Sequence, residues 1–331
     1  MPKKKRTNHQ KKVYRLARKL QRKAGGKDTM TLTAARREVE RRSGSHEAAG
    51  KSPSRQSPPP DAWAKATGDF GRQLADAILA YAAPIFWGVG DPTGGMDEDV
   101  RNGTTFFVDT GEATFGVTAG HVFEAYKARA DATGVLCQIG IGDAGKGSPV
   151  FDLRERLIAH SQSPDIATYR ISPEELARTR ARVFKEAEWP PKPPKVEAGV
   201  AFVGYPRSGR EIVAPRRIAW DNFHGTAFVE SLSDERISCP IPREWIVPIK
   251  GMRFPAPGED TAGLSGGPLV CFNQGAVLSW RPVGVICDGG GGDHEGEGGP
   301  FLDMVVGARA DLINSDGTIN ELPRPRRRTP Q

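Results

Sequence analysis

Short runs of apolar and β-branched residues, separated by Gly, Pro and Asp turns, follow one another from residue 81 onward. This spacing is typical of an all-β barrel or sandwich. A Pro-rich segment at 190–194 divides the runs into two sets of six. The predicted strands are 82–88, 104–109, 114–119, 135–141, 149–159 and 166–171 in the first set, and 198–204, 211–220, 225–231, 235–240, 267–272 and 282–288 in the second.

Helical patterns lie before, between and after the two strand sets. Ser172 and Glu175 flank Pro173 as a capping box, which predicts a helix that starts there and ends near Trp189. Further helices are expected at 69–80 and 304–314.

Charge separates the first 60 residues from the rest of the chain. Residues 1–60 hold 18 Lys/Arg and 4 Asp/Glu residues, a net charge of +14. Residues 61–331 hold 29 Lys/Arg and 36 Asp/Glu residues, a net charge of −7. A Ser/Pro-rich linker ends the basic segment. We therefore expect a largely disordered basic arm at 1–60, a folded domain at 61–318 and a basic Pro-rich tail at 319–331.

A strongly basic arm usually contacts nucleic acid, an acidic partner or an anionic surface. Its only aromatic residue is Tyr14, so base stacking is not indicated. A solvated arm without a partner is the alternative. The run Pro2–Arg6 resembles a nuclear localisation signal, although such runs are frequent by chance in basic tails.

The stretch with the clearest chemistry is Gly263-Leu264-Ser265-Gly266-Gly267-Pro268. A serine hydroxyl is a poor nucleophile unless a base removes its proton and backbone N–H groups hold the resulting oxyanion. Glycines on both sides let the backbone turn sharply and let a substrate carbonyl approach. The alternative is a Gly-rich turn between two strands.

Two other segments supply a base and an acid. His121 ends the apolar run that begins at Val117, and Asp165 begins another such run. The chain order His, Asp, Ser is that of chymotrypsin-type enzymes, whereas subtilisin and the α/β-hydrolases use other orders. The glycines around Ser265 also fit an α/β-hydrolase elbow. That motif needs a helix and then a histidine downstream, and the only downstream histidine, His294, lies in a glycine-rich loop.

Together these segments resemble the chymotrypsin/trypsin-like serine peptidases, in particular their bacterial trypsin-like domains. The resemblance covers about residues 80–315, and Val283–Gly289 is similar to the strand that lines the primary specificity pocket of the family. It implies an all-β fold of two six-stranded antiparallel β-barrels, with helices at the N-terminus, between the barrels and at the C-terminus. The barrels are expected at about 81–171 and 196–308.

The resemblance also implies a role for each candidate residue. His121 would act as general base toward Ser265 and then as general acid, and Asp165 would fix the tautomer of His121. The backbone N–H groups of Gly263 and Ser265 would form the oxyanion hole. A core histidine and a turn aspartate after Pro164 are the structural alternatives.

Four further residues are candidates for substrate binding. Glu259 and Asp288 fall near the expected specificity pocket, where a carboxylate would pair with a cationic side chain. The alternative for Glu259 is a solvated loop position. Cys287, Asp288 and Gly289 are expected to offer backbone hydrogen bonds to an extended substrate.

The four cysteines, at 137, 239, 271 and 287, contain no C-x-x-C pair that would suggest a zinc site. In secreted relatives the cysteine after the serine motif is often bridged to the first strand of the second barrel, and residues 199–204 hold no cysteine. No secretion signal or membrane span is expected, because the N-terminus is charged and the apolar stretch 74–89 is interrupted. These observations favour reduced thiols and a cytoplasmic location, or a nuclear one in a eukaryote.

The sequence therefore predicts a serine endopeptidase that needs no cofactor and acts on a protein or peptide substrate. Two other functions stay open. One is a catalytically silent trypsin-like scaffold that binds peptides. The other is a nucleic-acid-binding protein that acts through its basic arm.

Overall fold

The computed structural model describes residues 73, 76–88, 100–140, 147–186, 188–214, 217–241, 261–274, 278–288 and 304–320. The predicted arm at 1–60 and all but the first two residues of the predicted tail lie outside this part of the chain. Their boundaries stay predictions.

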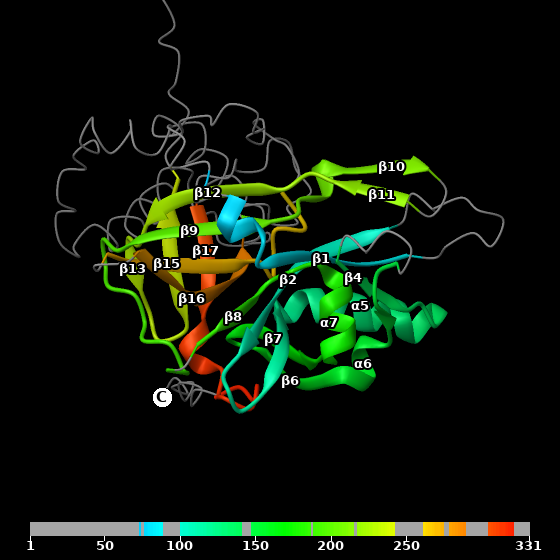
Figure 1. The fold of residues 1–331 in the computed structure, drawn as a ribbon, viewed down its shortest axis with the longest axis horizontal. Helices are drawn as coiled ribbons and strands as arrows, with labels where there is room; N and C mark the ends of the chain where they lie inside the picture. Colours follow the sequence, from blue (N-terminus) through cyan, green and yellow to red (C-terminus); the bar gives the residue numbers. More distant parts are fainter. Residues whose placement is uncertain are drawn as a thin grey trace, which may run out of the picture. The chain divides into compact units, whose positions relative to one another are not determined.

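Two curled β-sheets, antiparallel except for one short strand, build the described chain (Figure 1). The first runs in the order β5 (Val150–Phe151), β4 (Cys137–Ile139), β1 (Ala82–Trp87), β2 (Arg101–Asp109), β3 (Thr114–Thr118), β7 (Asp165–Arg170) and β6 (Leu157–Gln162). The short strand β8 (Val183–Lys185) pairs with β2 in parallel. This sheet corresponds to the first predicted barrel.

The second sheet runs in the order β12 (Phe223–Phe228), β9 (Gly199–Gly204), β15 (Pro268–Gln274), β16 (Leu278–Asp288), β17 (Met304–Arg309), β14 (Arg236–Pro240) and β13 (Ser231–Leu232). A separate hairpin joins β10 (Arg210–Ala214) to β11 (Arg217–Trp220). The sheets hold eight and seven strands, against the six expected for each. The predicted fold class is confirmed: the architecture is all-β and fits the double β-barrel fold of chymotrypsin-like proteins.

A shared core joins the two sheets. One buried cluster contains side chains of both sheets, among them Phe106 and Ile166 from the first and Val203 and Val285 from the second, each 0% exposed. Burying large apolar side chains is the main favourable term in folding, so this cluster fixes the first sheet against the second. Strands β7 and β16, which carry Asp165 and Cys287, both contribute side chains to it.

Several predicted elements differ from those observed. Residues 304–314 form strand β17, paired with both β14 and β16, and then one 3₁₀ turn at Ala310–Leu312 rather than a helix. Val305 and Ala308 are buried in the sheet. The prediction followed local periodicity, whereas the open edges of two neighbouring strands impose the extended conformation.

The capping box is confirmed, because Ser172 and Glu175 exchange hydrogen bonds around the N-terminus of α7 (Pro173–Thr179). The helix is shorter than predicted and ends at Arg180, where φ is +64°. The chain then forms β8, whose Phe184 enters the core, so tertiary burial overrides the helical pattern that continues to Trp189.

Two helices lie where none was predicted. The segment 149–159 is split into β5, the short helix α6 (Leu153–Arg156) and β6. The long helix α5 (Gly120–Thr133) begins beside His121 and ends at Gly134 in the left-handed conformation, with φ of +69°. Residues 76–79 are helical, within the helix expected at 69–80. None of the helices in the described chain is long and apolar enough to cross a bilayer.

Candidate active site

The turn from β3 into α5 places His121 beside the first residues of β7. Thr118 at the end of β3 pairs with Ala167 of β7. Between Thr118 and His121 the chain passes through Gly120, where a Cβ atom would lie 2.6 Å from the Ser161 carbonyl oxygen and 2.8 Å from Asp165 Oδ1. Only glycine fits this close approach, so Gly120 lets His121 reach the aspartate.

The Asp165 carboxylate contacts His121 twice. Its Oδ1 accepts the backbone N–H of His121 at 2.7 Å, and its Oδ2 lies 2.6 Å from the ring Nδ1. The first contact also satisfies one of the N–H groups that the first turn of a helix leaves without a partner. The Asp165 side chain is 14% exposed and the His121 side chain 50%, so the acid is shielded while the imidazole remains accessible.

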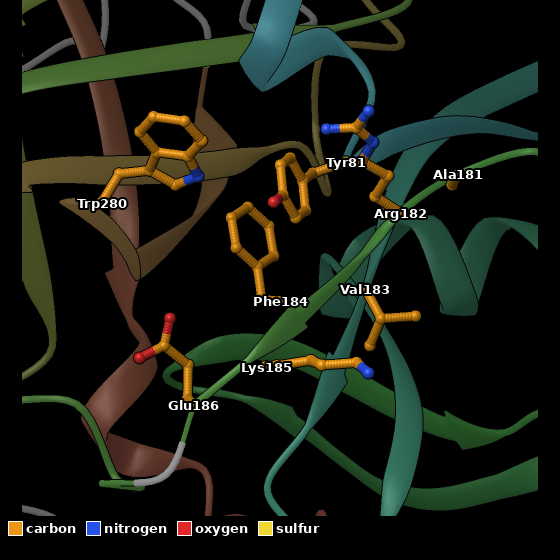
Figure 2. Close-up of a pocket in the computed structure, with 8 residues that line it drawn as sticks. All are labelled: Tyr81, Ala181, Arg182, Val183, Phe184, Lys185, Glu186 and Trp280. Carbon is orange, nitrogen blue, oxygen red and sulfur yellow. The ribbon is translucent and has the colours of Figure 1, made fainter. Parts of the chain in front are cut away.

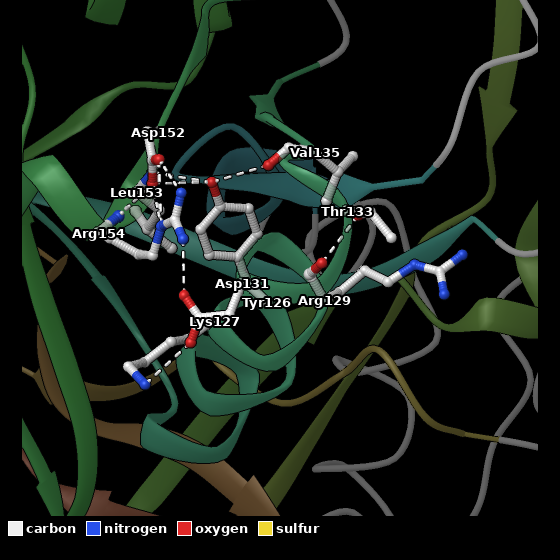
Figure 3. Close-up of polar contacts among 9 residues, drawn as sticks. All are labelled: Tyr126, Lys127, Arg129, Asp131, Thr133, Val135, Asp152, Leu153 and Arg154. Carbon is white, nitrogen blue, oxygen red and sulfur yellow. Dashed lines mark hydrogen bonds and ion pairs between the residues drawn. The ribbon is translucent and has the colours of Figure 1, made fainter.

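The far end of α5 is anchored to the rest of the first sheet (Figure 3). The single proton of the Tyr126 hydroxyl is shared between two acceptors, the Val135 carbonyl at 3.2 Å and Asp152 Oδ1 at 3.1 Å, and the hydroxyl oxygen accepts the Leu153 N–H at 3.2 Å. Burial raises the pKa of Tyr126 well above its ordinary value, so the phenol stays protonated and able to donate. Arg154 bridges Asp131 of the helix to Asp152. These contacts hold the helix that carries His121.

The loop that contains Ser265 is bonded to strands of both sheets. The Ser265 carbonyl accepts the Thr104 N–H of β2 at 2.8 Å, and Gly266 N–H donates to the Ile286 carbonyl of β16 at 2.7 Å. At Gly266, φ is +90° and a Cβ atom would lie 2.0 Å from the Thr104 carbonyl and 3.1 Å from the Ala119 N. The loop therefore packs directly on the strand ends that lead to His121, and Ser265 itself is partly exposed.

Two backbone N–H groups of this loop are oriented by the carbonyls of their own peptide units. The Ala262 carbonyl accepts the Arg207 N–H at 2.5 Å, and the Leu264 carbonyl accepts the Gly267 N–H at 3.0 Å. In a trans peptide the N–H points opposite to the C=O. The N–H groups of Gly263 and Ser265 thus point away from these partners, and within the described chain neither donates to a protein acceptor.

The predicted site residues fall into three groups. His121 and Asp165 are in direct contact, and the loop of Gly263 and Ser265 lies against the same strand ends. The Cys287 side chain packs in the core beside the Val306 carbonyl, which leaves only its backbone for a substrate. Asp288 ends β16. The Asp288 side chain, Glu259 and Gly289 lie outside the described residues.

Sequence reasoning missed one residue of the site, Thr104. It is fully buried on β2, and its atoms contact both Ser265 and Gly263. The available signal was two adjacent threonines, Thr104 and Thr105, directly before the apolar run Phe106–Val108. Buried hydroxyl groups need hydrogen-bond partners, so such a pair predicts contacts on both faces of the strand.

A separate hollow of about 480 Å³ lies along β8 and contains none of the predicted site residues (Figure 2). Tyr81 stacks on Phe184 with ring centroids 4.3 Å apart and meets Trp280 edge-on at 6.4 Å. Burial raises the pKa of Glu186, against the opposing attraction of Arg281. Arg182 and Lys185 also line the hollow, so its lining carries both charge signs.

Nowhere in the described ranges do three His, Cys, Asp or Glu side chains converge as ligands of a metal ion. All four cysteines lie in the described chain, where they are buried and form no disulfide. Burial raises the pKa of the thiols of Cys137, Cys239 and Cys271. These thiols are therefore protonated near neutral pH and react poorly as nucleophiles.

No family model matches the chain, and no curated protein matches it. Among solved structures it is similar to that of a thermostable serine protease, AL20, from an extremophilic microorganism. The two are 14% identical, over 71% of this chain and 92% of that protein, with a TM-score of 0.38. This likeness does not establish a family for the chain.

Proposed function

We propose that the protein is a serine endopeptidase in which Ser265, His121 and Asp165 form the catalytic triad. The observation that carries the proposal is the double contact of Asp165 with His121, because it sets both the position and the tautomer of the imidazole. With Nδ1 protonated and bonded to the carboxylate, Nε2 holds the lone pair that a general base needs.

The proposed reaction begins when Ser265 Oγ attacks the carbonyl carbon of a peptide bond. His121 Nε2 takes the hydroxyl proton, and the developing oxyanion is held by the N–H groups of Gly263 and Ser265. The C–N bond then breaks as His121 returns its proton to the leaving amine. Water, deprotonated by His121, hydrolyses the acyl-enzyme and restores Ser265.

Two features support this assignment over a turn serine and a structural histidine. The orientation of both N–H groups is set before any substrate arrives, as electrostatic stabilisation of a transition state requires. The imidazole is half exposed and its aspartate is shielded, whereas a structural core histidine would be buried on all sides. We propose no cofactor for the reaction.

The test is covalent labelling with a fluorophosphonate probe, which reacts with activated serine nucleophiles. We expect one label per chain, on Ser265. Labelling should disappear in Ser265→Ala and His121→Ala and persist in Ser279→Ala, which removes an exposed serine of β16. Turnover of a peptide should fall on the order of a million-fold in the first two variants. A folded wild-type chain that takes no label and cleaves nothing in a broad peptide library would favour the silent scaffold instead.

For specificity we propose that Glu259 or Asp288 makes the site favour Lys or Arg before the cleaved bond. An acidic side chain in a specificity pocket would pair with such a cation. A cleavage profile of a peptide library, with Glu259→Gln and Asp288→Asn beside the wild type, tests this. A wild-type preference for large apolar or acidic residues would reject it.

A further inference from the structure

Thr104 is 0% exposed, and each of its polar atoms is hydrogen-bonded. Its N–H donates to the Ser265 carbonyl at 2.8 Å, and its carbonyl accepts the Thr118 hydroxyl at 2.8 Å. Its Oγ1 accepts the Tyr205 N–H at 2.9 Å and donates to the Gly263 carbonyl at 2.6 Å. Because the Tyr205 N–H can only donate, the single hydroxyl proton is directed at Gly263.

The carbonyls on both sides of the Gly263 Cα are therefore held by two different elements. The Arg207 N–H holds the Ala262 carbonyl, and the Thr104 hydroxyl holds the Gly263 carbonyl. Asn102 Nδ2 in turn donates to the Tyr205 carbonyl at 2.8 Å. This bond fixes the segment 205–207, which supplies the Tyr205 N–H to Thr104 and the Arg207 N–H to Ala262.

Gly263 needs such restraint because it is free to rotate. Its φ is +101°, which only glycine adopts readily, and glycine has the widest range of backbone conformations. A Cβ atom there would lie 2.4 Å from Asn102 Nδ2, so a more rigid residue cannot replace it. The restraint has to come from hydrogen bonds made by neighbouring strands.

We propose that the Thr104 hydroxyl is a positioning residue for the oxyanion hole. The inference rests on the proposed peptidase function. The Gly263 N–H shares a peptide unit with the Ala262 carbonyl, which the Arg207 N–H holds, and Thr104 holds the Gly263 carbonyl in the next peptide unit. By fixing that second unit, Thr104 prevents rotation about the Gly263 backbone bonds, so the N–H keeps its direction before substrate binds. A donor fixed in advance stabilises the oxyanion of the transition state more than the ground-state carbonyl. Loss of the hydroxyl should therefore lower the rate of acylation and leave ground-state binding almost unchanged.

The neighbouring Thr105 provides a matched control. It is also 0% exposed, and its hydroxyl is also bonded, to the Val117 carbonyl at 2.8 Å and to the Tyr169 hydroxyl at 2.7 Å. Successive residues of a strand point to opposite faces, so Thr105 faces away from the Ser265 loop. Thr104→Val and Thr105→Val make the same chemical change in the same strand, and only the first touches Gly263.

The experiment measures the burst of p-nitrophenolate from p-nitrophenyl acetate, which gives the acylation rate constant and the half-saturating concentration. For Thr104→Val we expect the rate constant to fall about tenfold or more, below the 10²–10³-fold cost of losing a donor outright. The half-saturating concentration should change less than about threefold. Thr105→Val should lower the unfolding temperature about as much as Thr104→Val does. Unlike Thr104→Val, it should keep the wild-type acylation rate constant.

Two more variants keep the test decisive if Thr104→Val fails to fold. Thr104→Ser keeps the hydroxyl and should recover most of the acylation rate, whereas Thr104→Ala should not. Equal acylation rates in folded Thr104→Val and Thr105→Val, or in Thr104→Ser and Thr104→Ala, would overturn the inference. A wild-type chain that shows no burst and takes no fluorophosphonate label would instead count against the proposed function.

Discussion

Asp165 holds His121 at two points, accepting the backbone N–H at 2.7 Å and lying 2.6 Å from the ring Nδ1. One contact fixes the start of helix α5 on β7, and the other fixes the rotation of the imidazole about its side-chain bonds. A carboxylate is suited to both because each of its oxygens accepts and neither donates.

Asp165→Asn should separate these two functions. If the amide oxygen accepts the His121 N–H, the NH₂ group faces Nδ1, which must then accept and leave the proton on Nε2. That tautomer cannot act as base, and we expect turnover to fall about 10⁴-fold. The control Asp152→Asn removes a carboxylate that contacts Arg154 and Tyr126 at the other end of α5. Activity of Asp165→Asn within tenfold of the wild type would contradict the assigned role.

Gly266→Ala should destabilise the fold more than a positive φ alone explains. The φ of Gly266 is +90°, and the new Cβ would lie 2.0 Å from the Thr104 carbonyl oxygen. Gly111→Ala is the matched control, because its φ is +81° and nothing lies within 4 Å of its Cβ position. The control should cost about 1–2 kcal/mol of unfolding free energy in urea. A similar cost for Gly266→Ala would mean that the loop can move away from β2.

The thiols should resist alkylation in the native protein. Burial raises the pKa of Cys239 to about 12, with a smaller contribution from Glu230, and it raises the pKa of Cys137 further. Almost no thiolate is therefore present at pH 8, and the thiolate is the nucleophile. Iodoacetamide without reductant should modify none of the buried thiols in the native state and all four in urea, by intact mass. A mass that shows a disulfide would count against a reducing, cytoplasmic location.

Glu186→Gln should stabilise the protein near neutral pH. Burial raises the pKa of Glu186, because loss of hydration outweighs the attraction of Arg281. A carboxyl group with a raised folded-state pKa contributes stability only at low pH, and that contribution is lost as pH rises through the folded-state pKa. The unfolding temperature of Glu186→Gln should exceed that of the wild type at pH 7, and the difference should shrink below about pH 4. Glu188→Gln, at an exposed position, is the control, and a destabilised Glu186→Gln at pH 7 would show that the Arg281 attraction is the larger effect.

Local patterns were sufficient to predict most strands and the capped start of α7, because alternation and capping depend on neighbouring residues. They failed where a distant partner decides the conformation. Residues 304–309 became a strand because β14 and β16 both offer an edge, and the helix after Ser172 stopped early because Phe184 enters the core. Helix α5 went unpredicted, since its first turn is capped by Asp165 from another strand rather than by a residue of its own.

The sequence by itself determined which residue types are available for chemistry: a histidine after small residues, an aspartate at a strand start and a serine among glycines. These are local choices that set backbone freedom and side-chain reactivity. Only the tertiary structure decided that Asp165 meets both the N–H and the ring of His121, and that Thr104, on a strand far from Gly263 in sequence, holds its carbonyl. Hydrogen bonds act over about 3 Å. The contact of His121 with Asp165, 44 positions away, therefore exists only after the first sheet has formed, and the contact of Thr104 with Gly263, 159 positions away, only after the two sheets have packed.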